Sequence, residues 1–319
     1  MTSSLSAAVD ALRAGELVAF PTETVYGLGA DAANPDAVHR LFAVKGRPAD
    51  HPVIVHVGST GQLVELARNV PDAAHRLADA FWPGALTIVV ERNPVRVADA
   101  VTGGRTTVGL RVPDHPLALA LLDGFGGGVA APSANRFGRV SPTTAQHVRA
   151  DLGADVRVVL DGGQCRVGVE STIVDVTGDE PTILRVGGVS RTAVERVLGV
   201  PVALRTRGEV AAPGALESHY APLVTVEVVE ASDVGARARA LAAAGLRSGL
   251  LALAGVVPEQ PDGVVVLDAP RDVDEFAHVL YDRFRAADAR ELDVLLVVKP
   301  PDTDGIGAAV ADRVCRASH

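Results

Sequence analysis

Short apolar segments alternate with helix-like segments along most of the 319-residue sequence, and this alternation constrains the fold more than any other feature. Many strands with crossover helices and a few hairpins indicate a mixed α/β sheet with flanking helices. In the first part of the chain we expect buried strands at residues 17–20, 53–57, 87–90, 108–111, 128–131, 156–160, 173–176 and 182–185. The last two should pair as a hairpin around Gly178 and Asp179.

Capping residues mark three expected helix starts. Asn34 is a good N-cap, and Pro35 after it suits the first helical turn. Ser141, followed by a proline, is the expected cap of a second helix, and Ser190 is the expected cap of a third that runs to residue 198.

The alternation breaks between residues 205 and 222, where glycine and proline interrupt any regular period. It then resumes, with strands expected at 224–229, 249–254, 263–267 and 294–298 and helices at 234–244, 273–287 and 306–316. We therefore expect a large domain over 1–204, a linker over 205–222 and a small Rossmann-like βαβ domain over 223–319.

Composition excludes several classes of protein. The net charge of −9 argues against stable nucleic-acid binding, which usually needs a basic surface. Cys165 and Cys315 form no CxxC pair, so neither a disulfide framework nor a zinc site is indicated. The sequence has neither a signal-peptide pattern at its start nor a run of apolar residues long enough to span a membrane, so we expect a cytoplasmic location.

The common phosphate-binding and hydrolase motifs are absent, so a nucleotide function must depend on other residues. Four cations, Lys45, Arg47, Arg111 and Arg185, stand at or just after apolar runs. Ligands of α/β sheets collect where strands end, so these cations could converge on a polyanion. Taken singly, each is more commonly a solvated surface charge.

Loops of small polar residues join these cations at residues 21–27, 131–135 and 170–172. Their hydroxyl and amide groups could hold ribose, phosphate or an amino acid, although plain turn chemistry is an equal alternative for any one loop. Ser133 lacks the glycine-flanked turn of a hydrolase nucleophile. His56, on an apolar strand, is when taken alone better explained as a packed histidine than as a ligand.

An ordered series of motifs resembles the threonylcarbamoyl-AMP synthases, which have the YrdC-like fold. The motifs are FPTETVYGLG (20–29), KGRP (45–48), PVIVH (52–56), WPGALT (82–87), LRVP (110–113), PSAN (132–135) and ESTIVD (170–175). The sequence HYAP (219–222) and the C-terminal region resemble the longer, two-domain form of the family. The resemblance therefore extends over nearly the whole chain.

The resemblance implies a YrdC-like catalytic domain over 1–204 with a twisted mixed sheet. The composition of the linker over 205–222 suggests that it closes over the active site: Pro213 and Gly214 supply a bend, and Ser218, His219 and Tyr220 add polar and aromatic groups that a mere spacer does not need. The alternative for the linker is a solvent-exposed tether. The implied enzyme is a nucleotidyltransferase that makes L-threonylcarbamoyl-AMP and pyrophosphate from L-threonine, bicarbonate or CO2, and ATP. Its product would pass to the transferase machinery that forms N6-threonylcarbamoyladenosine at position 37 of tRNA. Mg²⁺ is expected with ATP but without a dedicated protein site, because no carboxylate cluster stands out.

The resemblance also assigns roles to individual residues. The residues expected to bind L-threonine are Thr24, His56, Arg111, Ser133 and Ser171. The residues expected to bind ATP are Arg47, His51, Thr107, Ala131, Asn135, Ser141, Arg185 and Tyr220. Lys45 and Arg47 are the expected catalytic residues, which would offset charge on the phosphates or the carbamate. His51 and Ala131 depart from the family pattern, in which Asn and Thr or Ser are common.

Three alternatives stay open. The same fold serves a carbamoyl-adenylate enzyme of hydrogenase maturation, but the acylphosphatase-like or zinc-finger segments expected of that enzyme are not seen in this sequence. An RNA-binding module is disfavoured by the acidic balance. A paralogue that binds RNA or nucleotide without synthase activity is disfavoured by the intact KGRP and PSAN motifs.

Overall fold

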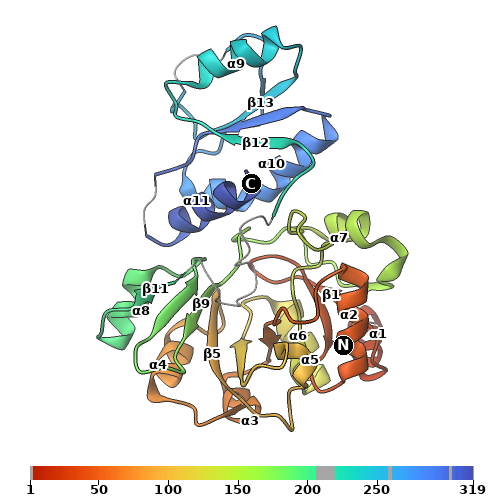
Figure 1. Cartoon of the computed structure of the whole chain (residues 1–319). Coiled ribbons are helices and arrows are strands. Elements are labelled where there is room, and N and C mark those ends of the chain that lie inside the picture. The colour runs from red at the N-terminus through yellow and green to blue at the C-terminus, as the bar shows by residue number, and fades with distance from the viewer. Residues whose placement is uncertain (1–2, 206–219, 258–260, 302–303, 319) are drawn as a thin grey trace.

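The computed structural model describes residues 3–205, 220–257, 261–301 and 304–318, which form two α/β domains lying against each other (Figure 1). Each domain has its own sheet. Of the expected linker, only residues 205 and 220–222 are described, so Pro213, Gly214, Ser218 and His219 lie outside the described residues.

The first domain is built on one mixed sheet with the strand order β11-β10-β9-β5-β6-β3-β7-β2-β1-β8, and β4 pairs beside β5. Its strands are β1 (Val18–Phe20), β2 (Gly27–Asp31), β3 (Val55–His56), β4 (Ala67–Arg68), β5 (Leu86–Arg92), β6 (Thr107–Arg111), β7 (Val129–Ala130), β8 (Val158–Val159), β9 (Thr172–Asp175), β10 (Thr182–Arg185) and β11 (Ala203–Leu204). Strands β3 and β6 pair in parallel, whereas β5 and β6 pair antiparallel. The predicted mixed sheet is therefore confirmed, and β9 and β10 form the predicted antiparallel pair.

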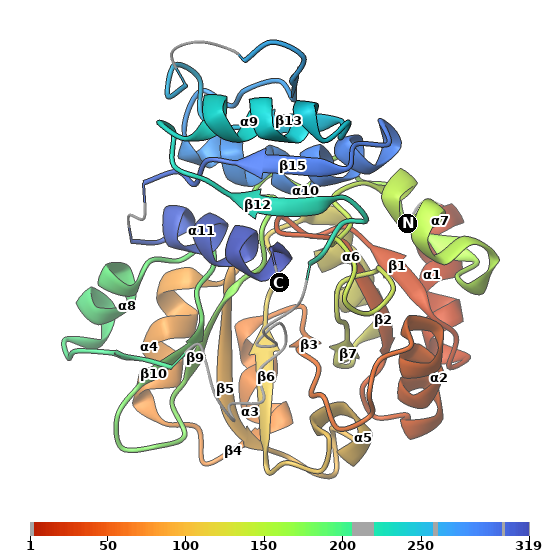
Figure 2. The ribbon, with the colours of Figure 1, turned by 45° about the horizontal axis from the view of Figure 1, so that its top comes forward.

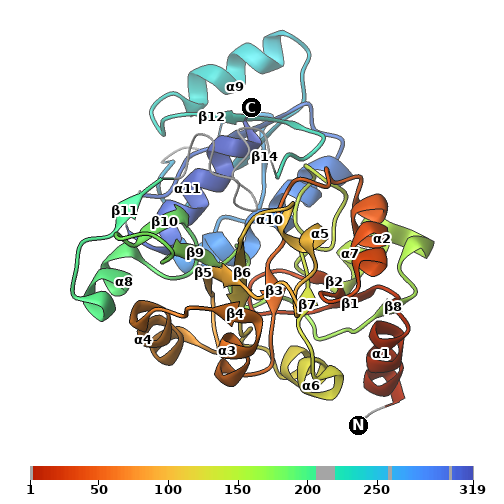
Figure 3. The same cartoon turned by 60° about the horizontal axis from the view of Figure 1, so that its bottom comes forward.

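Helices cover this sheet along its length (Figure 2, Figure 3). They are α1 (Ser3–Arg13), α2 (Pro35–Lys45), α3 (Leu63–Leu66), α4 (Asp72–Phe81), α5 (Asp99–Thr102), α6 (Pro116–Phe125), α7 (Ala145–Leu152) and α8 (Arg191–Leu198), with short 3-10 turns η1 (Thr60–Gln62) and η2 (Gly153–Asp155). Helices α4 and α8 pack together at the β11 side, and α1 packs on α6 near β1. None of the helices in the described part of the chain is both long and apolar enough to cross a membrane.

The second domain is a small parallel sheet in the order β12-β15-β13-β14, as the Rossmann-like prediction requires. Its elements are β12 (Thr225–Val228), α9 (Val234–Ala243), β13 (Ser248–Leu251), β14 (Val265–Val266), α10 (Val273–Ala289), β15 (Val294–Val297) and α11 (Ile306–Ala317). Figure 1 shows α9 on the outer face of this sheet, whereas α10 and α11 lie between the sheet and the first domain.

Two of the three predicted helix caps are confirmed, and one is wrong. The side chain of Asn34 accepts hydrogen bonds at the start of α2, and the side chain of Ser190 does so at the start of α8. Ser141 caps no helix, because α7 begins at Ala145 and its cap is Thr144. The Ser141 hydroxyl instead donates to the Glu170 carboxylate at 2.7 Å, so the chain enters its helix three residues later than expected.

The sequence pattern does not predict strand β2, because two of its five residues are glycines, which have low strand propensity. Gly29 is needed there for close packing. A Cβ atom at this position would lie 2.7 Å from a methyl carbon of Val129 on the neighbouring β7. The strand therefore depends on tertiary contact rather than on local preference.

Apolar contact joins the two domains. Three valines of the first domain, Val25, Val140 and Val169, are buried in the same apolar cluster as Tyr281 and Phe284 of α10. Each valine lies in a loop of the first domain rather than in one of its strands or helices. The second domain therefore holds loops of the first.

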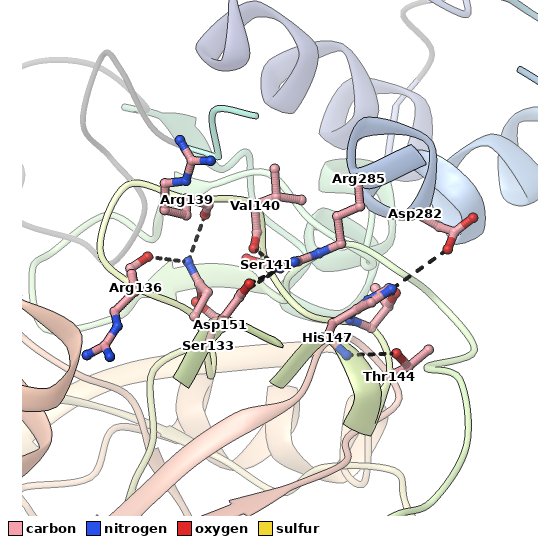
Figure 4. A network of polar contacts seen from close by, with 12 residues as sticks. Ser133, Arg136, Arg139, Val140, Ser141, Thr144, His147, Asp151, Asp282 and Arg285 are labelled. Atoms are coloured by element: carbon pink, nitrogen blue, oxygen red, sulfur yellow. Dashed lines mark hydrogen bonds and ion pairs between the residues drawn. The ribbon is translucent and has the colours of Figure 1, made fainter. Parts of the chain in front are cut away.

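Polar contacts reinforce this interface on the α7 side (Figure 4). Arg285 of α10 donates to both carboxylate oxygens of Asp151 on α7, at 2.8 and 2.6 Å, and to the carbonyl of Val140 at 2.7 Å. His147 of α7 faces Asp282 of α10, with 3.8 Å between Nε2 and Oδ1. The bidentate pair of Arg285 and Asp151 fixes the orientation of the two helices as well as their distance.

Substitution of Gly168 should weaken the interface. This residue has φ +85°, and a Cβ on it would lie 2.3 Å from the carbonyl oxygen of Ala277 in α10. Gly163 has a similar φ of +79° with nothing within 4 Å, so it is a matched control. We expect Gly163→Ala to cost about 1–2 kcal/mol of unfolding free energy from left-handed strain alone, and Gly168→Ala to cost measurably more because α10 must also shift. Urea denaturation of both variants checks this; equal losses would contradict the close approach of α10.

Candidate functional site

A cavity lies in the first domain where several strands end, and Tyr220, near the end of the expected linker, contributes to its wall. It is lined by Thr22, Thr24, Val25, Gly27, Arg47, Ile54, His56, Arg111, Ala131, Pro132, Ser133, Glu170, Ser171, Arg185 and Tyr220. Nine of the residues predicted to bind ligand are among them: Thr24, Arg47, His56, Arg111, Ala131, Ser133, Ser171, Arg185 and Tyr220. The sheet thus brings together side chains that are far apart in the sequence.

A tight turn after β1 presents the first hydroxyl group of the site. The Thr22 hydroxyl donates to the carbonyl of Val25 at 2.6 Å and accepts from the backbone N–H of Thr24. The hydroxyls of Thr22 and Thr24 are themselves 2.9 Å apart. Thr22 was not assigned a role from the sequence, yet its side chain holds the conformation of the loop that carries Thr24.

Three buried arginines give the cavity a positive wall. Arg47, Arg111 and Arg185 are 8%, 4% and 5% exposed. Burial lowers the pKa of the Arg47 guanidinium to about 10 and also lowers the pKa of Arg185. Because burial of positive charge is unfavourable without partners, the wall favours an anionic ligand.

Each arginine is held by neighbouring acceptors. Arg47 donates to the carbonyl of Pro52 at 2.9 Å, and Arg111 donates from Nε to the carbonyl of Gly84 at 3.0 Å. Arg185 donates from Nε to the carbonyl of Ser171 and from Nη2 to its hydroxyl, both at 3.0 Å. The guanidinium planes are therefore oriented before any ligand arrives.

Glu23 is the acidic neighbour of Arg111. Its Oε1 lies 2.7 Å from Arg111 Nη2, and both groups are almost fully buried. Neither atom has a well-aligned hydrogen-bonding partner among the described residues, so the pair is an ion contact without hydrogen-bond geometry. Arg111 therefore keeps donor capacity for a second anion.

His56 faces the cavity at the end of β3. It is 4% exposed, its ring packs edge-on against Phe20, and its Nδ1 has no hydrogen-bonding partner among the described residues. Burial, assisted by the positive charge of Arg111, holds the pKa of His56 well below its usual value. The imidazole is therefore neutral near pH 7, with a nitrogen available to a ligand.

Lys45 does not line the cavity in this structure. It ends α2, and its Nζ donates to the carbonyls of Ser133 and Asn135, both at 2.5 Å. Burial, together with the charge of Arg47, holds the pKa of this amine well below its usual value. Lys45 thus braces the PSAN loop from behind, and its predicted role toward phosphate or carbamate stays a prediction.

Four other predicted ATP ligands also lie outside the cavity lining. Asn135 donates to the carbonyls of Arg136 and Arg139, and Ser141 donates to Glu170. The half-buried ring of His51 packs edge-on against Phe137. Thr107 begins β6, whereas Arg111 ends it, so they are about 13 Å apart along the strand.

Glu170 is the acidic residue of the wall to which the sequence assigned no role. Burial alone would raise the pKa of its carboxyl group, but Arg313 and Arg185 outweigh that effect and lower the pKa to about 2. Because Arg313 is on α11, in the other domain, no local sequence pattern could have connected them.

The fold and the cavity define a class: an α/β protein with a cationic cavity at the strand ends of a mixed sheet, beside a second α/β domain. Residues 10–187 match the Sua5/YciO/YrdC model, described as "Telomere recombination", and residues 189–319 match the model described as "Threonylcarbamoyl-AMP synthase, C-terminal domain".

Individual proteins with similar sequences or structures belong to the same family. A threonylcarbamoyl-AMP synthase of Bacillus subtilis is 40% identical over 319 aligned positions, covering 96% of this chain and 90% of the relative. A putative threonylcarbamoyl-AMP synthase of Mycobacterium tuberculosis is 46% identical over 196 positions, covering 61% of this chain and 89% of the relative. The crystal structure of Pyrococcus abyssi Sua5 complexed with L-threonine has a TM-score of 0.92 and 38% identity, covering 98% of this chain and 94% of that one. The chain belongs to the Sua5 family of threonylcarbamoyl-AMP synthases, in its two-domain form.

Loss of the Lys45 amine should destabilise the protein. Lys45→Met keeps the apolar stem but leaves the carbonyls of Ser133 and Asn135 without their donor, at an expected cost of about 1–3 kcal/mol. The chain has only one other lysine, Lys299, which is exposed. Lys299→Met should change the unfolding free energy by less than about 0.5 kcal/mol. Denaturant unfolding compares the two, and equal stabilities would show that Lys45 does not brace the loop.

Proposed function

We propose that this protein condenses L-threonine, bicarbonate or CO2, and ATP into L-threonylcarbamoyl-AMP and pyrophosphate. The observation that carries the proposal is the cavity itself, in which three buried arginines, a neutral histidine and several hydroxyls converge. Membership of the two-domain synthase family supports it, as does the close likeness to a structure that holds L-threonine.

The proposed chemistry needs no covalent enzyme intermediate. The neutral amine of threonine adds to CO2 and gives a carbamate, losing a proton. A carbamate oxygen then attacks the α-phosphorus of ATP, the bond to the β-phosphate oxygen breaks, and pyrophosphate leaves. The work of the protein is positioning and stabilisation of negative charge.

The residues of the cavity divide between the two substrates. Arg111 would pair with the threonine carboxylate, since a guanidinium offers a bidentate fork. The unpartnered nitrogen of neutral His56 would accept a hydrogen bond from a donor group of threonine. Arg47 and Arg185 would offset the charge of the ATP phosphates, and Tyr220 would close the ATP side of the cavity.

Mg²⁺ would enter as the counter-ion of ATP. Within the described residues, no group of three or more His, Cys, Asp or Glu side chains is placed to hold a metal ion. Glu170, which lines the cavity, is already paired with Arg313, and Glu23 is paired with the lining residue Arg111. We therefore expect phosphate and water, rather than a dedicated protein site, to supply most of the Mg²⁺ ligands.

The product is a reactive adenylate, so we expect it to pass to a separate transferase that modifies adenosine 37 of tRNA, in the cytoplasm. The acidic chain itself is not expected to hold tRNA stably. A paralogue that binds nucleotide without making product is the remaining alternative, and substrate dependence separates it from a synthase.

Pyrophosphate release should require all three substrates. Incubation of the full-length protein with ATP, bicarbonate and threonine should release pyrophosphate, and omission of any one should abolish the release. A coupled pyrophosphate assay measures this. Equal release without an amino acid would identify an ATP hydrolase instead, and no release with all three would favour the non-catalytic paralogue.

Arg111 and Arg185 should affect different substrates. Arg111→Ala should weaken threonine binding by about 2 kcal/mol, roughly thirtyfold, because a charge-assisted contact is lost. Arg185→Ala should instead weaken binding of a non-hydrolysable ATP analogue. Calorimetry with each ligand measures both effects.

A control is needed because Arg111→Ala also leaves Glu23 without its ion partner. Glu23→Gln removes that carboxylate charge while keeping Arg111, so it should not weaken threonine binding. Identical ligand profiles for the Arg111 and Arg185 variants would refute the division of the cavity.

A further inference from the structure

The carboxylate of Glu170 joins the wall of the cavity to the second domain. It is 6% exposed and accepts hydrogen bonds from Ser141 Oγ at 2.7 Å, from the Tyr281 hydroxyl at 2.9 Å and from Arg313 Nε at 2.8 Å. Ser141 belongs to the first domain, whereas Tyr281 and Arg313 come from α10 and α11 of the second. One buried carboxylate therefore connects the ligand cavity with two helices that do not line it.

The other end of Arg313 holds a second part of the wall. Its Nη2 donates to the carbonyl of Val186 at 3.0 Å, and Val186 directly follows Arg185 in the chain. The Arg313 side chain is completely buried, and its guanidinium carbon lies 5.1 Å from the centre of the Tyr220 ring. A single guanidinium thus touches the two segments that carry Ser171 and Arg185.

Apolar packing repeats the same pattern. Val25, Val140 and Val169, which are buried against the second domain, immediately adjoin Thr24, Ser141 and Glu170. The second domain therefore packs against three loops, each at a valine next to a polar residue. Two of these polar residues, Thr24 and Glu170, line the cavity, and the third, Ser141, donates a hydrogen bond to Glu170.

Charge compensation gives these contacts a role in ligand binding. A buried carboxylate without Arg313 would attract the nearest remaining cation, and Arg185 is close enough to lower the pKa of Glu170. Arg185 now holds Ser171 through two hydrogen bonds. Compensation of Glu170 by Arg313 would therefore spare Arg185 that attraction and leave it in its present orientation, facing the cavity.

We propose that Arg313 and Tyr281 are positioning residues for the ATP half of the site, acting through Glu170 on Ser141 and Arg185. The second domain is then part of the geometry of the active site although neither residue lines the cavity. This inference rests on the proposed synthase function, because a KM for ATP can be measured only if the protein makes product. Direct binding of a nucleotide provides a second measurement that does not depend on catalysis.

The central test is a rescue in the full-length protein. Arg313→Met removes the charge and keeps much of the side-chain volume, and it should raise the KM for ATP at least tenfold while changing the KM for threonine less than threefold. Adding Glu170→Gln to this variant removes the uncompensated carboxylate, so it should restore at least a third of the lost ATP affinity. Calorimetry with a non-hydrolysable ATP analogue should rank the affinities in the same order, with the wild type tightest, the double variant intermediate and Arg313→Met weakest.

Asp304 provides a matched control at the same interface. Its carboxylate accepts hydrogen bonds from the backbone N–H groups of Arg191 and Thr192, both at 2.8 Å, which also join the second domain to the first. Asp304→Ala should lower the melting temperature without changing the KM for ATP. Equal effects of Asp304→Ala and Arg313→Met on ATP affinity, or no rescue by Glu170→Gln, would overturn the proposal.

Tyr281→Phe keeps the proposal testable if Arg313→Met does not fold. It removes only the hydroxyl that donates to Glu170, and it should raise the KM for ATP about threefold with a stable fold; an unchanged KM would count against the proposal. A wild-type protein without threonine-dependent pyrophosphate release would refute the synthase function. Analogue binding by the same variants would still decide whether Arg313 positions the nucleotide site.

Discussion

Burial of positive charge is the constraint on which the rest of this structure depends. Arg47, Arg111 and Arg185 are removed from water around one cavity, and folding must supply acceptors for each of them. Backbone carbonyls and one serine supply most of these acceptors, because strand ends place them at fixed positions. Neutral carbonyls satisfy hydrogen bonds without cancelling charge, so the cavity wall is suited to an anionic ligand. The positive wall of the cavity thus follows from the way the sheet ends, without any glycine-rich phosphate loop.

The second domain contributes to this compensation of buried charge and is not simply an appended unit. The relative from Mycobacterium tuberculosis aligns with only 61% of this chain, so a protein given a synthase name can be much shorter. In this chain, however, Val25, Val140 and Val169 are buried against the second domain and Glu170 is neutralised by it. Removal of that domain would expose apolar side chains and leave a buried carboxylate uncompensated. A one-domain relative must satisfy the corresponding positions by other means.

The sequence predicts the architecture well because periodicity and strand-end chemistry are local. Arg111 and Arg185 each end an apolar run, which predicts a position at a strand end, and both line the cavity. Lys45 ends its helix in the same way, but its amine turns to two carbonyls of a neighbouring loop, which only the tertiary structure defines. Ser141 looks like a helix cap locally, yet its hydroxyl is taken by a carboxylate 29 positions away. The link between Glu170 and Arg313 joins residues 143 positions apart, so no local pattern could reveal it.

That separation also has a consequence for biosynthesis. Domains fold largely as units during translation, at about 5–20 residues per second. Every residue lining the cavity except Tyr220 is made before the linker, so the first domain can begin to fold while α10 and α11 are still unsynthesised. Until Arg313 leaves the ribosome, Glu170 lacks its guanidinium partner and the three interface valines have no apolar surface to cover them. The nascent first domain therefore spends several seconds with Glu170 uncompensated, and this contact forms only after α11 has been synthesised.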